Sequence, residues 1–174
     1  SLFLILPFLT TSLLLTDFIT AFFIRGNPIP RLKLEKVPDD AKTLVVITTL
    51  LFGAEKDKRL FESLERFYLL NKDDNIFFGI LGDLPDSKQK VMLGDAETMR
   101  FAKEQIDLLN QKYGERFCLF LRERVENKTD GIFGGRERKR GAVTELVGFI
   151  RGKRNSEILY TGGGFIHDIK YIFT

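Results

Sequence analysis

The stretch TLVVITTLL, residues 43–51, is a continuous apolar run rich in β-branched side chains. Such a run lacks the polar alternation of a half-exposed strand and is typical of a strand buried on both faces. Gly53 follows and ends the run. The stretch therefore predicts a central strand of a sheet that is covered by helices on both sides.

Helical and strand-like segments alternate downstream of this stretch. Apolar residues from Leu60 to Tyr68 recur at spacings of three and four, which predicts an amphipathic helix over 56–70. The same pattern analysis predicts a strand at 75–81, a helix at 95–113, a strand at 116–121, a helix ending near 151 and a strand at 169–174. This alternation indicates an α/β fold with a parallel sheet and right-handed crossovers.

Two stretches show neither pattern. Residues 123–130 are polar and predict a loop. The run Gly162-Gly163-Gly164 precedes no helical pattern and predicts a flexible turn.

The N-terminal segment differs from the rest. Residues 2–24 are almost wholly apolar, and at about 1.5 Å per residue they could cross a bilayer core of about 30 Å. Basic residues follow at Arg25 and Arg31, which by the positive-inside tendency places the remaining chain in the cytoplasm. We predict a transmembrane helix at 1–25, and a buried helix of a soluble domain is the alternative. Asp17 must then face a polar partner, such as another helix.

The proline-rich stretch Asn27-Pro28-Ile29-Pro30 predicts a stiff linker, which we place at 26–42, before a globular domain at 43–174. The composition suits such a domain, with 44% hydrophobic and 29% charged residues. A net charge of +3 is too small for a general nucleic-acid binder. Cys118 is the only cysteine, which excludes an internal disulfide, and it is expected to fill the core. His167, the only histidine, is expected at the surface.

The stretch GGRERKRG, residues 134–141, is predicted to be a glycine-bounded loop that carries several cations and leads directly into a segment with helical spacing. Free N–H groups, a helix dipole and cations together suit a phosphate or diphosphate, although a solvated basic loop is the alternative. In parallel sheets, ligands bind at the carboxyl ends of the strands, where Thr48, Thr49, Asp83 and Asp86 are expected to join this stretch. An acidic residue there could bind a ribose or base N–H, so a nucleotide-linked substrate would suit the edge. No G-x-G-x-x-G follows the first strand, and no P-loop motif occurs.

Four short stretches occur in the order IPRL (29–32), VVITTLL (45–51), LGDLPD (81–86) and ERKRG (137–141). Together they resemble the glucosyltransferase region of cyclic β-1,2-glucan synthases, very large membrane-embedded enzymes with a GT-A-type transferase region. Residues 139–144, KRGAVT, are also similar to the Lys-x-Gly-Ala-Leu-Asn run of the wider GT-A superfamily. The resemblance implies an incomplete GT-A-like, Rossmann-like parallel sheet with flanking helices, preceded by the hydrophobic helix.

The resemblance also implies seven donor-binding residues. The nucleoside side, next to the uridine of UDP-glucose, would be formed by Thr49, Asp83 and Asp86. The diphosphate side would be formed by Arg138, Lys139, Arg140 and Gly141, where the glycine would let the backbone approach.

Two departures from the family pattern limit this comparison. The family often has Trp next to the glutamate of the basic stretch, whereas here Arg136 precedes Glu137 and the chain contains no Trp. The Asp-x-Asp motif that binds the divalent cation would follow Thr174, and Asp168 lies before the last strand. The ligands of the expected Mg or Mn and the catalytic base are therefore expected outside this chain.

The resemblance implies part of a membrane-bound glycosyltransferase of the bacterial inner membrane, with its soluble part facing the cytoplasm. It would transfer glucose from UDP-glucose to a growing β-glucan acceptor, together with the remaining transmembrane helices and domains of a larger protein. The alternative is a non-catalytic, membrane-anchored module whose basic stretch binds anionic lipid or a partner protein. The basic stretch lies more than a hundred residues from the hydrophobic segment, which counts against lipid binding.

The 174-residue polypeptide alone is expected to show negligible transfer from UDP-glucose and at best weak UDP binding, because the implied metal motif and base are missing from it. Release of UDP from UDP-glucose would measure this activity. Steady turnover by the polypeptide would contradict the expectation.

Overall fold

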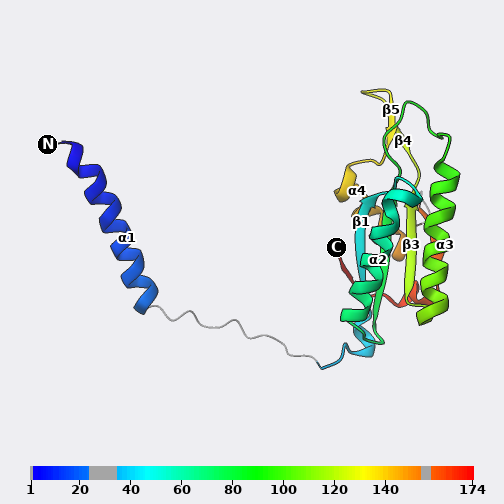
Figure 1. The fold of residues 1–174 in the computed structure, drawn as a ribbon, viewed down its shortest axis with the longest axis horizontal. Helices are drawn as coiled ribbons and strands as arrows, with labels where there is room; N and C mark the ends of the chain where they lie inside the picture. The colour runs from blue at the N-terminus through cyan, green and yellow to red at the C-terminus, as the bar shows by residue number, and fades with distance from the viewer. Residues whose placement is uncertain (1, 24–34, 154–157) are drawn as a thin grey trace. The chain divides into compact units, whose positions relative to one another are not determined.

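The computed structural model describes residues 2–23, 35–153 and 158–174 (Figure 1). They belong to two separate units, an N-terminal helical unit and an α/β unit that begins at Glu35. The predicted helix end at residue 25 and residues 26–34 of the predicted linker lie outside the described residues.

The N-terminal unit contains a short 3₁₀ helix, η1 (Leu2–Leu4), and the 19-residue helix α1 (Ile5–Phe23). Its threonine hydroxyls donate to carbonyl oxygens one turn earlier, as from Thr11 Oγ1 to Pro7 O at 2.7 Å. These bonds satisfy the hydroxyls within the helix itself. The predicted N-terminal apolar helix is confirmed, and α1 is long and apolar enough to span a membrane. That it does so stays a prediction.

The α/β unit is built on a five-stranded sheet with the order β6-β3-β2-β1-β7. Its strands are β1 (Thr43–Leu50), β2 (Ile76–Asp83), β3 (Phe117–Arg122), β6 (Ile158–Gly162) and β7 (Tyr171–Phe173). Neighbouring strands are parallel except at the edge, where β6 runs antiparallel to β3. The α/β prediction is confirmed, and the sheet is mostly parallel.

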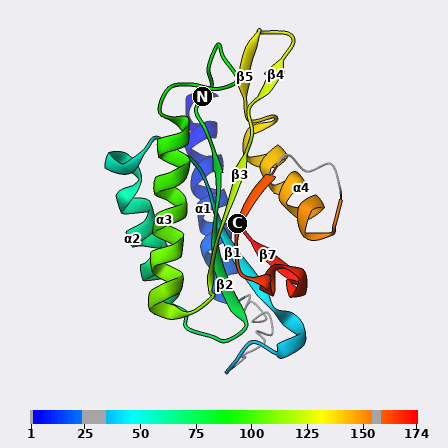
Figure 2. The same cartoon turned by 90° about the vertical axis from the view of Figure 1, so that its right-hand side faces the viewer.

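Helices cover both faces of the sheet, as Figure 2 shows. Helices α2 (Ala54–Leu70) and α3 (Asp95–Tyr113) pack on one face around Phe78, Ile80 and Leu119. Helix α4 (Arg138–Ile150) and the 3₁₀ helix η3 (Gly164–Asp168) pack on the other. A further 3₁₀ helix, η2 (Asp39–Ala41), precedes β1.

Cys118 is fully buried in this second layer, as predicted. Its burial raises the pKa of the thiol, which therefore stays protonated. His167 is exposed in η3, also as predicted.

Two predictions of irregular structure are wrong. Gly162 is the last residue of β6 and pairs with Cys118, and Gly164 is the first residue of η3, so a strand end followed directly by a 3₁₀ helix replaces the predicted flexible turn at 162–164. The predicted loop at 123–130 contains β4 (Val125–Asn127), which pairs with β5 (Ile132–Gly134) in a hairpin. The hairpin is tied to the turn after β2 by two main-chain hydrogen bonds between Ser87 and Phe133. Strands of three to five residues are too short to show a clear hydrophobic period.

A second link holds the same turn in place. The buried Arg124 binds both carboxylate oxygens of Asp95 at the start of α3, and its Nε donates to Pro85 O at 2.7 Å. Burial alone would raise the pKa of Asp95, but hydrogen bonds from Arg124 and the Met92 N–H, with the Arg124 charge, hold it below its usual value. Asp95 is therefore ionised while it fixes the segment between β2 and α3.

Asp95→Asn should lower the free energy of unfolding at pH 7 by about 3 kcal/mol, because it leaves the buried Arg124 charge without that carboxylate. Since the folded-state pKa of Asp95 is lowered, its contribution is present above about pH 3.9 and is lost as the pH falls through the lowered value. Urea unfolding at several pH values checks this. The difference between wild type and variant should narrow below about pH 4, and a constant difference would contradict the assignment.

Candidate functional site

The carboxyl ends of the central strands are aligned by their register. Leu50 of β1 lies opposite Asp83 of β2, and Asp83 lies opposite Arg122 of β3. The turn after β2, the β4–β5 hairpin and the first turn of α4 all lie beyond this edge. The edge is where a parallel sheet normally places its ligand.

The side chain of Arg122 is 2% exposed and is paired with two carboxylates. Its Nε and Nη2 donate to the two oxygens of Asp83 at 2.7 and 2.6 Å. Its Nη1 donates to Glu145 Oε1 of α4 at 3.0 Å. A buried guanidinium is stable only when it is paired in this way, because removing an ion from water costs several kcal/mol.

The same guanidinium also binds the backbone before α4. Nη1 donates to Arg136 O at 3.2 Å and Nη2 donates to Arg138 O at 3.3 Å. With the three carboxylate contacts, these two bonds use all five N–H donors of Arg122. Between the two carbonyls, Glu137 and Arg138 have φ angles of 53° and 46°. This left-handed region is unfavourable for residues with a Cβ, so the surroundings must hold the backbone there.

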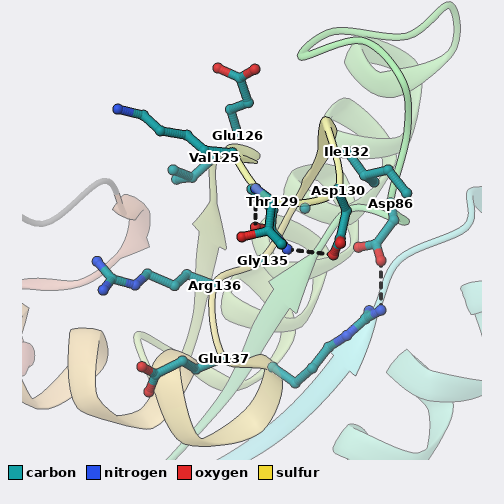
Figure 3. A pocket seen from close by; sticks show the side chains of 13 residues that line it. Asp86, Val125, Glu126, Thr129, Asp130, Ile132, Gly135, Arg136 and Glu137 are labelled. Carbon is teal, nitrogen blue, oxygen red and sulfur yellow. Dashed lines mark hydrogen bonds and ion pairs between the residues drawn. The ribbon is translucent and has the colours of Figure 1, made fainter.

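Asp86 and Arg138 form an ion pair in the wall of an open cavity. Asp86 Oδ2 accepts a hydrogen bond from Arg138 Nη2 at 2.6 Å, and the two side chains are 38% and 63% exposed (Figure 3). The cavity measures about 730 Å³ and lies between the hairpin, the turn after β2 and residues 134–138. Most of the side chains that line it are polar or charged, and Val125 and Ile132 of the hairpin are apolar (Figure 3).

The predicted basic stretch is placed differently from expectation. It was predicted as a loop that precedes a helix, but α4 begins at Arg138, so its cations occupy the first helical turn. Lys139 and Arg140 are exposed there, and Arg140 Nε lies 4.0 Å from Glu137 Oε2. Glu137 is the N-cap of α4, and both Glu137 and Arg138 have φ angles in the left-handed region where the chain enters the helix.

The structure brings some predicted site residues together and separates one. Asp86 and Arg138 line the cavity, whereas Asp83 is not one of its lining residues, is 12% exposed and is paired with Arg122. Thr49 is apart from them. Its neighbours Ile47 and Leu51 pack on the α2–α3 face, so strand alternation places the Thr49 side chain on that face. Thr48 instead shares the face of Asp83.

Arg122 and Glu145 were missed by sequence reasoning. Arg122 is the charged last residue of an apolar strand, and in the sequence it indicates only where that strand ends. Glu145 lies on the polar side of a helical pattern. The sequence holds no signal that the two meet, because the partners of Arg122 lie 14 to 39 positions away.

The glycines of the basic stretch permit close packing. A Cβ on Gly135 would lie 2.3 Å from Asp83 Oδ2, and one on Gly134 would lie 2.2 Å from Asp86 Oδ1. A Cβ on Gly141, which is buried in α4, would lie 2.0 Å from Arg136 O. A side chain at Gly135 or Gly141 would therefore displace buried protein atoms, whereas one at Gly134 would displace only the half-exposed carboxylate of Asp86.

Gly141→Ala should destabilise the protein by about 1–3 kcal/mol through overpacking, although alanine normally favours a helix over glycine by about 1 kcal/mol. Urea unfolding measures the change. Gly148→Ala in the same helix is the matched control, because its Cβ would meet only the flexible Lys153 side chain, at 3.3 Å. Equal effects of the two substitutions would contradict the assignment.

No group of three His, Cys, Asp or Glu side chains that could hold a metal gathers within residues 2–23, 35–153 and 158–174. Asp168, which precedes β7, forms an ion pair with Lys42 at 2.8 Å. The described side chains thus do not fit the divalent cation of the resemblance, and the expectation that its ligands follow Thr174 stays a prediction.

No protein-family model matches the chain. The chain is 34% identical over 145 residues to the cyclic β-(1,2)-glucan synthase NdvB of Rhizobium meliloti. The match covers 81% of this chain and 5% of that protein, so the chain spans a small part of its relative's length. The resemblance inferred from the motifs is confirmed at this level, and the chain is similar to one region of a cyclic β-(1,2)-glucan synthase.

Proposed function

We propose that the α/β unit binds the sugar donor of a membrane-bound, glucan-synthesising glycosyltransferase. The donor is UDP-glucose, and the acceptor is a growing β-glucan. The similarity to a glucan synthase supports the reaction class. The chain's own contribution is to hold the nucleoside and diphosphate of the donor at the carboxyl edge of its sheet.

The observation that carries this proposal is the contact between Asp86 and Arg138 beside the cavity. The two residues lie 52 positions apart and were assigned to the nucleoside and diphosphate sides, respectively. Their side chains meet at 2.6 Å, and the cavity beside them, about 730 Å³, is within the usual range for small-molecule sites.

The diphosphate side is supported by the charges of α4. Its first turn carries Arg138, Lys139 and Arg140 and no acidic residue. Cations at this end of a helix repel one another and oppose the helix dipole, so they lower the stability of the helix. A bound diphosphate would offset both effects, and charge-assisted hydrogen bonds to it would be strong.

The nucleoside side rests on the two aspartates. Asp86 is accessible and can accept an N–H from the base, although it must share its oxygens with Arg138. Asp83 can reach a ligand only with the acceptor positions that Arg122 leaves open. Thr49 is not part of this proposed donor site, because its side chain faces the layer of α2 and α3.

We propose α1 as the membrane anchor, with the α/β unit on the cytoplasmic side. Its 19 residues rise about 28 Å, close to the thickness of a bilayer core. Asp17 lies within the helix and would face a polar partner in the remaining protein.

Lys139→Ala combined with Arg140→Ala should weaken UDP binding by the full-length protein about tenfold or more, because a charge-assisted contact contributes about 1.5–3 kcal/mol and the loss of even one such contact lowers affinity about tenfold. Isothermal titration with UDP measures the affinity. The matched control is Lys58→Ala with Arg59→Ala, the same two residue types side by side and exposed on α2. The control should keep wild-type affinity.

Titration with anionic vesicles separates the proposal from lipid binding. If the Lys139/Arg140 variant kept its UDP affinity but lost binding to phosphatidylserine vesicles, the basic stretch would be a lipid contact. If it lost neither, the stretch would be solvated surface.

A further inference from the structure

Arg122 is a buried cation at a place where the strand pattern would accept an apolar residue. Its charge is already balanced by Asp83, yet two of its N–H groups donate to the carbonyl oxygens of Arg136 and Arg138. Both carbonyls belong to the basic stretch that the proposed function assigns to the diphosphate. The ion pair with Asp83 does not need these two hydrogen bonds, so they call for a separate explanation.

The two contacts with Arg122 also fix the direction of the N–H groups that follow the two carbonyls. In a trans peptide the C=O and the following N–H point in opposite directions, and the described residues contain no cis peptide. Carbonyls of Arg136 and Arg138 that face Arg122 therefore turn the N–H groups of Glu137 and Lys139 away from it. Within the part of the chain that the structure describes, neither N–H donates a hydrogen bond to the protein.

The guanidinium that sets this orientation is itself fixed from two elements. Asp83 at the end of β2 holds it in two contacts, and Glu145 holds it from the second turn of α4. The backbone between the two carbonyls, at Glu137 and Arg138, is in the left-handed region and would relax without such support. A lysine could keep the charge but not the five-donor fork.

We propose that Arg122 is a positioning residue for the donor: it holds the basic stretch so that the cations and free N–H groups before and within the first turn of α4 face the diphosphate. The inference rests on the proposed function. It assigns Arg122 no contact with the donor. Its effect passes through the backbone of residues 136–139.

The test is Arg122→Lys in the full-length protein, with affinities for UDP and UMP and the unfolding midpoint measured together. We expect UDP affinity to fall at least tenfold and the preference for UDP over UMP to shrink, because the misplaced stretch no longer favours the second phosphate. Amide hydrogen exchange of residues 136–141 should also increase.

The control for a purely structural effect is Asn75→Ala. Asn75 is buried at the opposite end of β2, where its side chain donates to Val37 O and Asp39. It should lower the unfolding midpoint while leaving UDP affinity and the UDP/UMP preference within twofold of wild type. If Arg122→Lys does not fold, Glu145→Ala replaces it, with an expected loss of UDP affinity of at least threefold.

Two failures can be told apart. If the wild type binds no UDP, both the proposed function and this inference are wrong. If the wild type binds UDP but Arg122→Lys, or Glu145→Ala in its place, keeps both affinity and preference within twofold, the positioning role is overturned and donor binding stands.

Discussion

The guanidinium of Arg122 lies almost wholly out of water between the carboxylates of Asp83 and Glu145. Removing one partner of such a pair costs about 3–5 kcal/mol, because the other charge then remains buried without compensation. The three charged side chains therefore stabilise the fold only when all of them are present. Two carbonyl oxygens of the basic stretch accept hydrogen bonds from the same guanidinium. The position of that stretch therefore depends on the ion pairs that hold Arg122.

Arg124, two residues after the end of β3, is a second buried arginine held by a carboxylate and by backbone carbonyls. It binds the carboxylate of Asp95 and the carbonyls of Pro85 and Lys90, and so holds the segment that carries Asp86. The two arginines thus fix the two segments that meet at the cavity. Glycines at 134, 135 and 141 allow the backbone to come close enough for these contacts.

The regular elements could largely be predicted. The helix at 95–113 was predicted with the observed bounds, and β1 ends one residue before its predicted end, because both segments are long and strongly patterned. The hairpin and β6 were missed because three to five residues show no clear period. The start of α4 was placed too late because left-handed backbone at Glu137 and Arg138 is not expected of residues with a side chain beyond Cα.

The sequence by itself determined the α/β class, the buried strands, the apolar N-terminal helix and the position of the basic stretch in the chain. These follow from local patterns of burial and charge. Tertiary structure alone decided that Asp83 pairs with Arg122, that Asp86 meets Arg138, and that Thr49 faces the other layer. The physical reason is that ion pairs between residues 39 and 52 positions apart depend on strand order and register, which leave no local signature.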